Sequence, residues 1–158
     1  MTGSDPWAST RVRAVGPGRF TADLAPAWDL AVVPQGGVIA AIAARAMEAA
    51  LANGQHLRSI HGVFASPVPS GPLDIGVEVL RAGRSASQAV ADVRAPGADH
   101  GFHALAAFGH DRAGPGAPFV GLEPPVVPAP EDCPRFRDGP PPEVDWPVHP
   151  PFPFWAEV

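Results

Sequence analysis

The sequence contains no lysine and no tyrosine, and its single cysteine is Cys133. One thiol cannot form a disulfide within the chain, nor a structural zinc site built from several thiolates. The fold must therefore depend on buried apolar side chains, and 158 residues are enough for one domain with its own core. A single thiol also fits a reducing cytoplasm, which is the compartment that we expect.

Clusters of basic residues are missing as well. The eleven basic residues are all arginines, and the formal net charge is −5. Nucleic acids and anionic membranes attract clustered positive charge, so we expect neither as a partner. The first ten residues contain no apolar segment typical of a secretory signal, and no apolar run approaches the ~20 residues that span a bilayer.

The prolines divide the chain into two parts. Eight of the 22 lie in residues 1–110 and fourteen in residues 111–158. Because proline cannot donate a backbone hydrogen bond and fixes its own φ, the second part can form little regular structure. We predict a folded domain over 1–110 and a proline-rich tail over 111–158. The tail ends in PFPFWAEV, which we expect to dock on a surface or to begin another strand.

A long helix is predicted over residues 34–54. A Pro-Gln-Gly-Gly turn precedes it, and Asn53 with the glycine after it should end it in a left-handed conformation. Apolar residues and alanines occupy nearly every side, and Arg45 and Glu48 are its only charged residues. A helix without a polar face must be covered by other elements.

Strand patterns lie on both sides of this helix. They are about ten residues long or shorter and end in turn residues, which favours an antiparallel meander. Two strands, a buried helix and four strands predict an α+β fold in which a curved antiparallel sheet wraps around one long central helix. The predicted strands are residues 7–15 and 19–24 before the helix, and 57–66, 73–81, 85–94 and 101–109 after it.

Six short motifs follow one another along this part of the chain. They are FTAD at 20–23, AWD at 27–29, PQGG at 34–37, SIHGVF at 59–64, SPVPSGP at 66–72 and VEVLRAGRS at 77–85. In order and spacing they resemble hotdog-fold thioesterases, most closely the N-terminal half of the acyl-CoA thioesterase II (TesB-like) type. The resemblance covers roughly residues 15–110. It implies a hotdog fold, an acyl-CoA or acyl-carrier thioester as substrate, and no cofactor or metal.

The chain departs from the thioesterase pattern in two ways. Single-domain hotdog thioesterases place an Asp or Glu about two turns into the helix, where this chain has Ala44. In the two-domain type, the resemblance implies that the catalytic Asp, Thr and Gln lie mainly in the second half. The ending FPFWAEV resembles the start of such a half, so the chain is consistent with a truncated or split double hotdog.

The start of the helix is the best candidate for a site. Backbone N–H groups at Gln35, Gly36 and Gly37 lack helical partners and could hold the oxyanion that forms when a thioester carbonyl is attacked. Glycine would also let a thioester approach the backbone closely. Alternatively, the glycines only allow a tight turn into the helix beneath the sheet. An acyl chain would lie along the helix, against Val38, Ile42 and Phe64.

Groups that could move a proton lie on either side of this turn. Asp29 could activate a water, or it could be a helix cap or a solvated turn residue. His61 could orient a carbonyl or a water, or it could be a hydrogen-bonded core histidine, and Ser59 shares its face by the period of two. The predicted catalytic residues are Asp29, Gln35 and His61, and the predicted oxyanion and substrate-binding residues are Gly36, Gly37, Val38, Ser59 and Phe64.

Other candidates are weaker. His100 and His103 are spaced like metal ligands but lack supporting ligands nearby, so no metal site is predicted. Gln88 and Asp92 share a solvated strand face by the same period of two. A lone hotdog leaves one sheet face and its edge strands open, so we expect a homodimer or a higher homo-oligomer.

Three functions remain open at this point. The first is hydrolysis of an acyl thioester by water, with the carbonyl oxygen at the helix start. The second, which Ala44 favours, is a non-catalytic binding or scaffold hotdog that holds an acyl ligand or pairs with a catalytic second hotdog. The third is a hydratase or dehydratase. It ranks last because that chemistry needs a base where the chain has Gln35.

Overall fold

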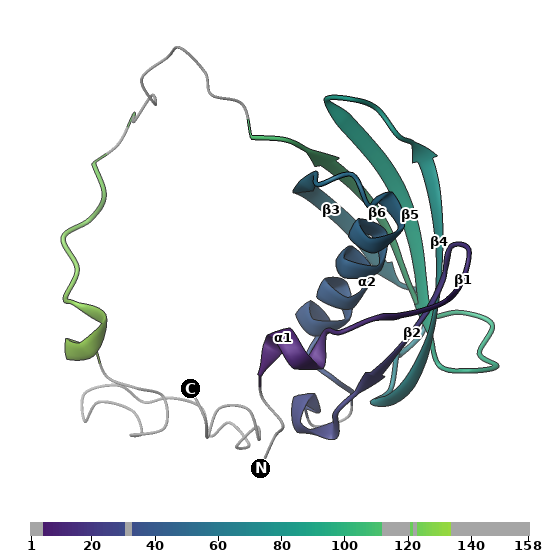
Figure 1. The fold of residues 1–158 in the computed structure, drawn as a ribbon. Coiled ribbons are helices and arrows are strands. Elements are labelled where there is room, and N and C mark those ends of the chain that lie inside the picture. The colour runs from purple at the N-terminus through teal and green to yellow at the C-terminus, as the bar shows by residue number, and fades with distance from the viewer. Residues whose placement is uncertain (1–4, 31–32, 112–120, 122, 134–158) are drawn as a thin grey trace.

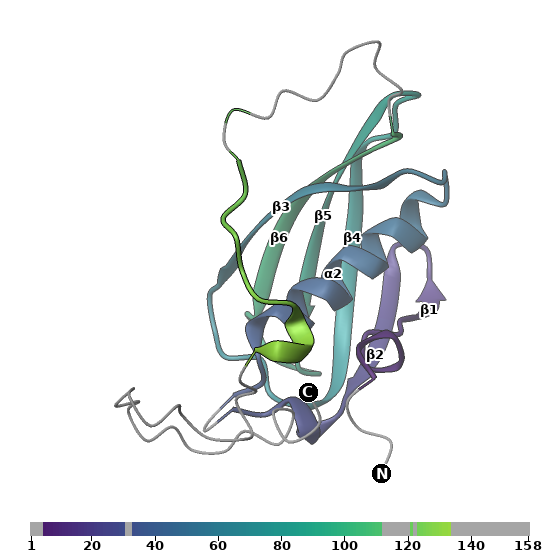
Figure 2. The same ribbon diagram turned by 90° about the vertical axis from the view of Figure 1, so that its left-hand side faces the viewer.

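The computed structural model describes residues 5–30, 33–111, 121 and 123–133. Within them, six strands form one antiparallel sheet, and the long helix α2 (Gly36–Leu51) lies across one of its faces (Figures 1 and 2). The predicted α+β architecture, a curved sheet around one helix, is confirmed. The segment PFPFWAEV lies outside the described residues. Within these residues, no helix combines the length and the apolar character that crossing a bilayer requires.

The strands do not pair in simple sequence order. They are β1 (Arg13–Gly16), β2 (Arg19–Leu24), β3 (His56–Phe64), β4 (Gly71–Arg81), β5 (Ala86–Arg94) and β6 (Phe102–Gly109). The sheet order is β1-β2-β4-β5-β6-β3. The predicted meander is therefore right for β4, β5 and β6, but wrong for β3, which pairs with β6 at the far edge.

The connection from β3 to β4 explains this placement. A two-residue turn would have joined the two strands as a hairpin. Residues 65–70 instead form a longer connection with prolines at Pro67 and Pro69. Six extended residues reach about 20 Å, whereas three strand spacings are about 14 Å, so the segment can pass the ends of β5 and β6.

The predicted strand over residues 7–15 is wrong in its first part. Helix α1 (Pro6–Ser9) occupies that stretch, and only Arg13–Gly16 pairs with β2. Asp5 caps α1 by accepting the Trp7 N–H at 3.0 Å, and Pro6 takes the first helical position. A capping carboxylate followed by proline is a helix-start signal, and here it outweighs the apolar alternation.

The N-terminal segment is fastened to α2 through Arg45. Its Nη1 donates to the Trp7 carbonyl oxygen at 2.8 Å and to the Thr10 hydroxyl at 3.0 Å. The guanidinium also lies 5.6 Å from the centroid of the Trp7 ring, within the range of a cation–π interaction. Part of α2 is thus contacted by a segment other than the sheet, as expected of a helix with few polar residues.

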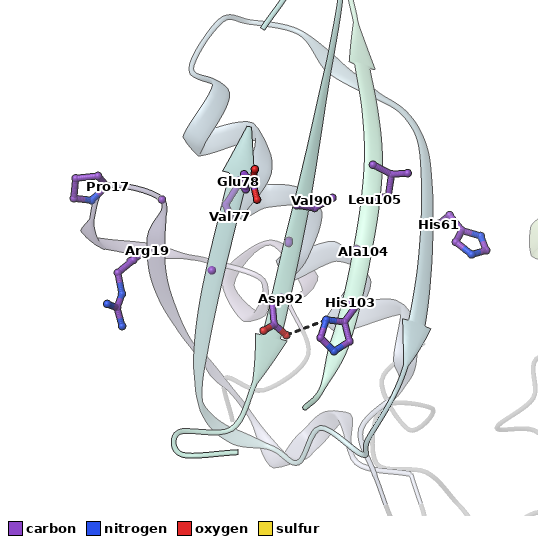
Figure 3. Close-up of a pocket in the computed structure, with 13 residues that line it drawn as sticks. Pro17, Arg19, His61, Val77, Glu78, Val90, Asp92, His103, Ala104 and Leu105 are labelled. Carbon is purple, nitrogen blue, oxygen red and sulfur yellow. Dashed lines mark ion pairs between the residues drawn. The ribbon is translucent and has the colours of Figure 1, made fainter. Parts of the chain in front are cut away.

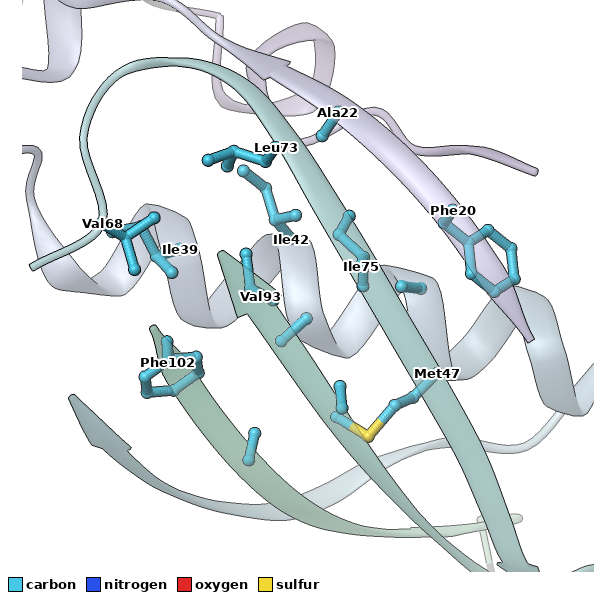
Figure 4. Close-up of a cluster of buried hydrophobic side chains, with 14 of the residues drawn as sticks. Phe20, Ala22, Ile39, Ile42, Met47, Val68, Leu73, Ile75, Val93 and Phe102 are labelled. Carbon is cyan, nitrogen blue, oxygen red and sulfur yellow. The ribbon is translucent and has the colours of Figure 1, made fainter. Parts of the chain in front are cut away.

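The core lies between α2 and the inner face of the sheet (Figure 4). Ile42 and Met47 of the helix and Leu73 and Val93 of the sheet are fully buried. The helix ends slightly earlier than predicted, because its left-handed residue is Ala52, with φ of 47°, rather than Asn53. The long predicted helix is otherwise confirmed.

Candidate functional site

The start of α2 is held by the loop that precedes it. The Gln35 N–H donates to the Trp28 carbonyl oxygen at 2.9 Å, and Asp29 forms an antiparallel bridge with Pro34. A 3-10 turn over Pro26–Trp28 directs the chain into this bridge. Although six residues separate Asp29 from Gln35, the bridge brings Asp29 beside the first turn of the helix.

The two carboxylate oxygens of Asp29 have different surroundings. Oδ2 accepts a hydrogen bond from the Ser70 hydroxyl at 3.1 Å. Oδ1 is buried and has no hydrogen-bond partner among the described residues. A carboxylate oxygen accepts hydrogen bonds from more than one donor, so Oδ1 keeps its capacity for a water or a substrate group. Ser70 is not among the predicted site residues, because 41 residues separate it from Asp29 and no local pattern connects them.

Gln35 caps the helix with its own side chain. Its Oε1 accepts the Val38 N–H at 3.0 Å, and the same N–H also reaches the Gln35 carbonyl oxygen at 3.1 Å. The helix itself offers no acceptor to the N–H groups of Gly36 and Gly37, and these lie at the positive end of its dipole. The site can therefore receive an anion or a polarised carbonyl at two adjacent backbone donors.

Both glycines make room for side chains of the same chain. A β-carbon at Gly37 would lie 2.8 Å from Oε1 of Gln35, so the missing side chain lets the cap fold back. A β-carbon at Gly36 would lie 3.2 Å from Cζ of Phe64, whose ring covers the helix start. The packing of this chain thus accounts for the glycine pair even without a ligand.

The Gln35 cap supports a stability prediction. Gln35→Ala should lower the free energy of unfolding by about 0.5–1 kcal/mol, because the Val38 N–H loses its side-chain acceptor and keeps only the Gln35 carbonyl oxygen. Urea unfolding measures the change. The matched control is Gln88→Ala on an exposed strand position, which should stay within about 0.5 kcal/mol of the parent. Equal losses in the two variants would show that the cap contributes nothing particular.

An apolar hollow of about 300 Å³ opens beside the helix start. Phe64 forms one wall, is 48% exposed, and packs its ring on that of Phe102 with 4.5 Å between the centroids. Val38 and Ile42, at 5% and 0% exposure, contact core side chains instead. The residues that line the hollow are Val33, Pro34, Ile39, Phe64, Ala65, Ser66, Pro67 and Val68.

His61 and Ser59 lie elsewhere. They line a hollow of about 370 Å³ on the outer face of the sheet, by which we mean the face opposite α2. The prediction that they share a face is confirmed, as is the common face of Gln88 and Asp92. The structure therefore brings Asp29, Gln35 and the glycine pair together, but within one chain it does not bring His61 or Ser59 to them.

The family of the chain follows from its sequence together with this fold. The model of the acyl-CoA thioesterase N-terminal domain family matches residues 24–109, more than half of the chain. The chain belongs to this family. The resemblance inferred from the six motifs is confirmed, and the match contains the helix start, Asp29 and the hollow at Phe64. No curated protein matches this acyl-CoA thioesterase domain.

Solved structures place this thioesterase domain in the hotdog fold. The tesB protein of Mycobacterium avium subspecies paratuberculosis is 28% identical, with a TM-score of 0.65 over 83% of this chain and 50% of that one. A hot dog fold protein of unknown function from Alicyclobacillus acidocaldarius is 22% identical, with a TM-score of 0.72 over 96% and 52%. The acyl-CoA thioesterase II TesB2 of Mycobacterium marinum is 18% identical, with a TM-score of 0.64 over 84% and 48%. The chain spans about half the length of each protein.

Proposed function

We propose that this domain hydrolyses an acyl-CoA or acyl-carrier thioester by attack of water at the start of α2. One observation carries the proposal: the backbone donors of Gly36 and Gly37 and the partly free carboxylate of Asp29 occupy the same end of one helix. Acyl transfer to water needs donors for the carbonyl oxygen and a base for the water. Membership of the thioesterase family supports this choice of reaction.

The proposed step needs only groups at this end of the helix. The thioester carbonyl oxygen accepts hydrogen bonds from the N–H groups of Gly36 and Gly37. At this position the helix dipole stabilises the negative charge that develops on the oxygen. Asp29 accepts the proton of the attacking water as the carbon–oxygen bond forms. The carbon–sulfur bond then breaks, the thiolate leaves with its electron pair, and Asp29 returns the proton to it. The products are a carboxylic acid and a free thiol.

The remaining parts of the site hold the substrate in this proposal. The acyl chain enters the apolar hollow along Phe64, because the hollow opens beside the oxyanion donors. Gln35, whose oxygen is engaged by the Val38 N–H, has its amide NH₂ available for the carbonyl. His61 and Ser59 lie on the other face of the sheet, so the step within one chain does not use them.

Thiol release from short, medium and long acyl-CoAs tests the reaction, in a Cys133→Ser background that removes the exposed thiol. Asp29→Asn should lower kcat/KM at least a hundredfold, a loss of about 2.7 kcal/mol of barrier lowering. Asparagine keeps an oxygen for the Ser70 hydroxyl but is a poor base. Asp23→Asn, on an exposed β2 position, is the control and should keep full turnover. Turnover by Asp29→Asn within threefold of the parent would exclude Asp29 as the base.

A second function, a binding or scaffold half that pairs with a catalytic hotdog, is favoured by one observation. Strand β3 is an edge of the described sheet, and its Val63 and Phe64 are 55% and 48% exposed. An edge strand presents unpaired backbone groups to which another chain can add. In this case no acyl-CoA is hydrolysed, yet acyl-CoA or the second hotdog still raises the Tm.

A further inference from the structure

Several apolar side chains on the outer face of the sheet are exposed to solvent. Val63, Leu80 and Leu105 are 55%, 52% and 49% exposed. A hollow of about 710 Å³ lies there beside the β1–β2 turn (Figure 3). It lies over Gly76, where an added β-carbon would meet no atom within 4 Å. Exposed apolar groups next to a hollow are typical of a surface that another protein covers.

Strand pairing arranges the outer face in rows that cross β4, β5, β6 and β3 in that order. The two central rows are Glu78–Val90–Leu105–His61 and Gly76–Asp92–His103–Val63. In each row the β4 and β5 side carries the acidic residue, and the β6 and β3 side carries the histidine. The empty position, Gly76, and the exposed Val63 stand at opposite ends of one row. If one copy of a row is turned end for end and placed against another copy, each acidic residue faces a histidine and Gly76 faces Val63. Two copies of the same row are therefore complementary when they run in opposite directions.

We propose that a second copy of this chain packs on the outer face, related by a twofold axis that runs parallel to the strands between β5 and β6. This axis reverses the order of the strands in the second copy, so that β5 faces β6 and β4 faces β3. Each row then faces the same row of the second copy. Glu78 then faces His61 of the second copy, and Val90 faces Leu105 of the second copy. The contact needs no thioester chemistry, so it does not depend on the proposed function.

The other row supports the same axis. Asp92 faces His103 of the second copy, and Val63 of the second copy enters the hollow over Gly76. Within one chain, Oδ1 of Asp92 lies 3.5 Å from Nδ1 of His103, and Oδ2 of Asp92 lies 3.6 Å from Nη1 of Arg94, so acidic and basic groups already lie next to each other on this face.

An axis perpendicular to the strands fits the outer face less well. Each strand would then face the same strand of the second copy, and the row that contains Val90 would face the row that contains Asp92. Val90 would meet Asp92 of the second copy and Leu105 would meet His103, so that apolar side chains face ionisable ones. Burying an ionisable group against an apolar one costs free energy. The parallel axis is therefore the one that the residues favour.

The area of the outer face sets the expected affinity of the dimer. Four strands about 4.8 Å apart and about eight residues long cover at most roughly 500 Å² per copy, or roughly 1,000 Å² in total. That total is at the lower limit for specific interfaces, so we expect a reversible dimer with a Kd of about a micromolar or weaker.

Sedimentation velocity of the full chain at a series of concentrations tests the proposal. Leu105→Glu should abolish the association, because it buries a charge at the centre of the contact. The control is Val79→Glu, a similarly exposed apolar residue (38%) that alternates onto the inner face of β4. This control should leave the association unchanged. Parent chains that stay monomeric throughout, or association that survives Leu105→Glu, would overturn the proposal; the latter would place the contact elsewhere, such as the β3 edge.

Exchanging the charges of a facing pair separates a lost contact from a folding defect, because a second substitution should restore the association. His61→Asp places a carboxylate opposite Glu78 of the second copy and should weaken the association at least tenfold, about 1.4 kcal/mol. Adding Glu78→Lys should restore it. Within one chain, residues 61 and 78 are three strand spacings apart, about 14 Å, so restoration can only come from contact between copies. A double variant that stays as weak as His61→Asp alone would contradict the arrangement.

Discussion

Ile42→Ala is expected to lower the free energy of unfolding by about 3 kcal/mol. Ile42 is fully buried at the middle of α2, facing the inner side of the sheet (Figure 4). Its removal loses buried apolar surface and leaves a void that a helix fixed along its length cannot close. For a folded domain of about 110 residues, the Tm should fall by about 13 °C.

Urea unfolding followed by circular dichroism measures this loss, and an unchanged m-value shows that the unfolded state is the same. Val15→Ala is the control, because Val15 is 54% exposed on β1 and should change stability by less than about 0.5 kcal/mol. If Ile42→Ala costs no more than Val15→Ala, the core does not lie between α2 and the sheet as described.

Gly101→Ala should be nearly as damaging, by about 3 kcal/mol, for a different reason. Gly101 is buried just before β6, and a β-carbon there would overlap the carbonyl oxygen of Val93. It would also lie 2.9 Å from Cβ of Arg94. Backbone cannot turn aside as a flexible side chain can, so the end of β5 has to shift. The Gly101 carbonyl oxygen accepts the Ala65 N–H at 2.9 Å, so the hollow beside the helix start should shift as well.

Gly76→Ala is the matched control, since a β-carbon at this strand position meets no atom. It should leave the free energy of unfolding within about 0.5 kcal/mol of the parent, measured at low protein concentration where the chain is monomeric. Two glycines in one sheet should thus differ strongly under the same substitution. A Gly101→Ala variant as stable as Gly76→Ala would contradict the close packing of β5 against the start of β6.

The elements that local signals specify could be predicted from the sequence. Helix α2 lies within the predicted residues 34–54, because a turn precedes it and helix formers run without interruption. Strands β4, β5 and β6 lie within two residues of their predicted bounds, because turn residues separate them and each pairs with its neighbour. In these segments, local conformation and tertiary structure favour the same arrangement.

The remaining features depend on contacts between distant residues. The position of β3 depends on a loop that can pass two strands, and the surroundings of Asp29 depend on Ser70, 41 residues away. The period of two places Ser59 and His61 on one face, but it does not say which face α2 covers. Sequence spacing therefore groups the candidate residues correctly along each strand, whereas only the three-dimensional arrangement separates His61 from the helix start.

The edge position of β3 has a consequence for synthesis of the chain on the ribosome. Strand β3 follows α2 directly, but its partner β6 ends at Gly109, so His56 cannot pair with Gly109 until the whole sheet has been made. Until then the apolar surface of α2 faces an unfinished sheet. Long-range pairing of this kind slows folding and leaves nascent chains open to aggregation. The domain must therefore complete its fold late, after β6 has emerged, rather than strand by strand.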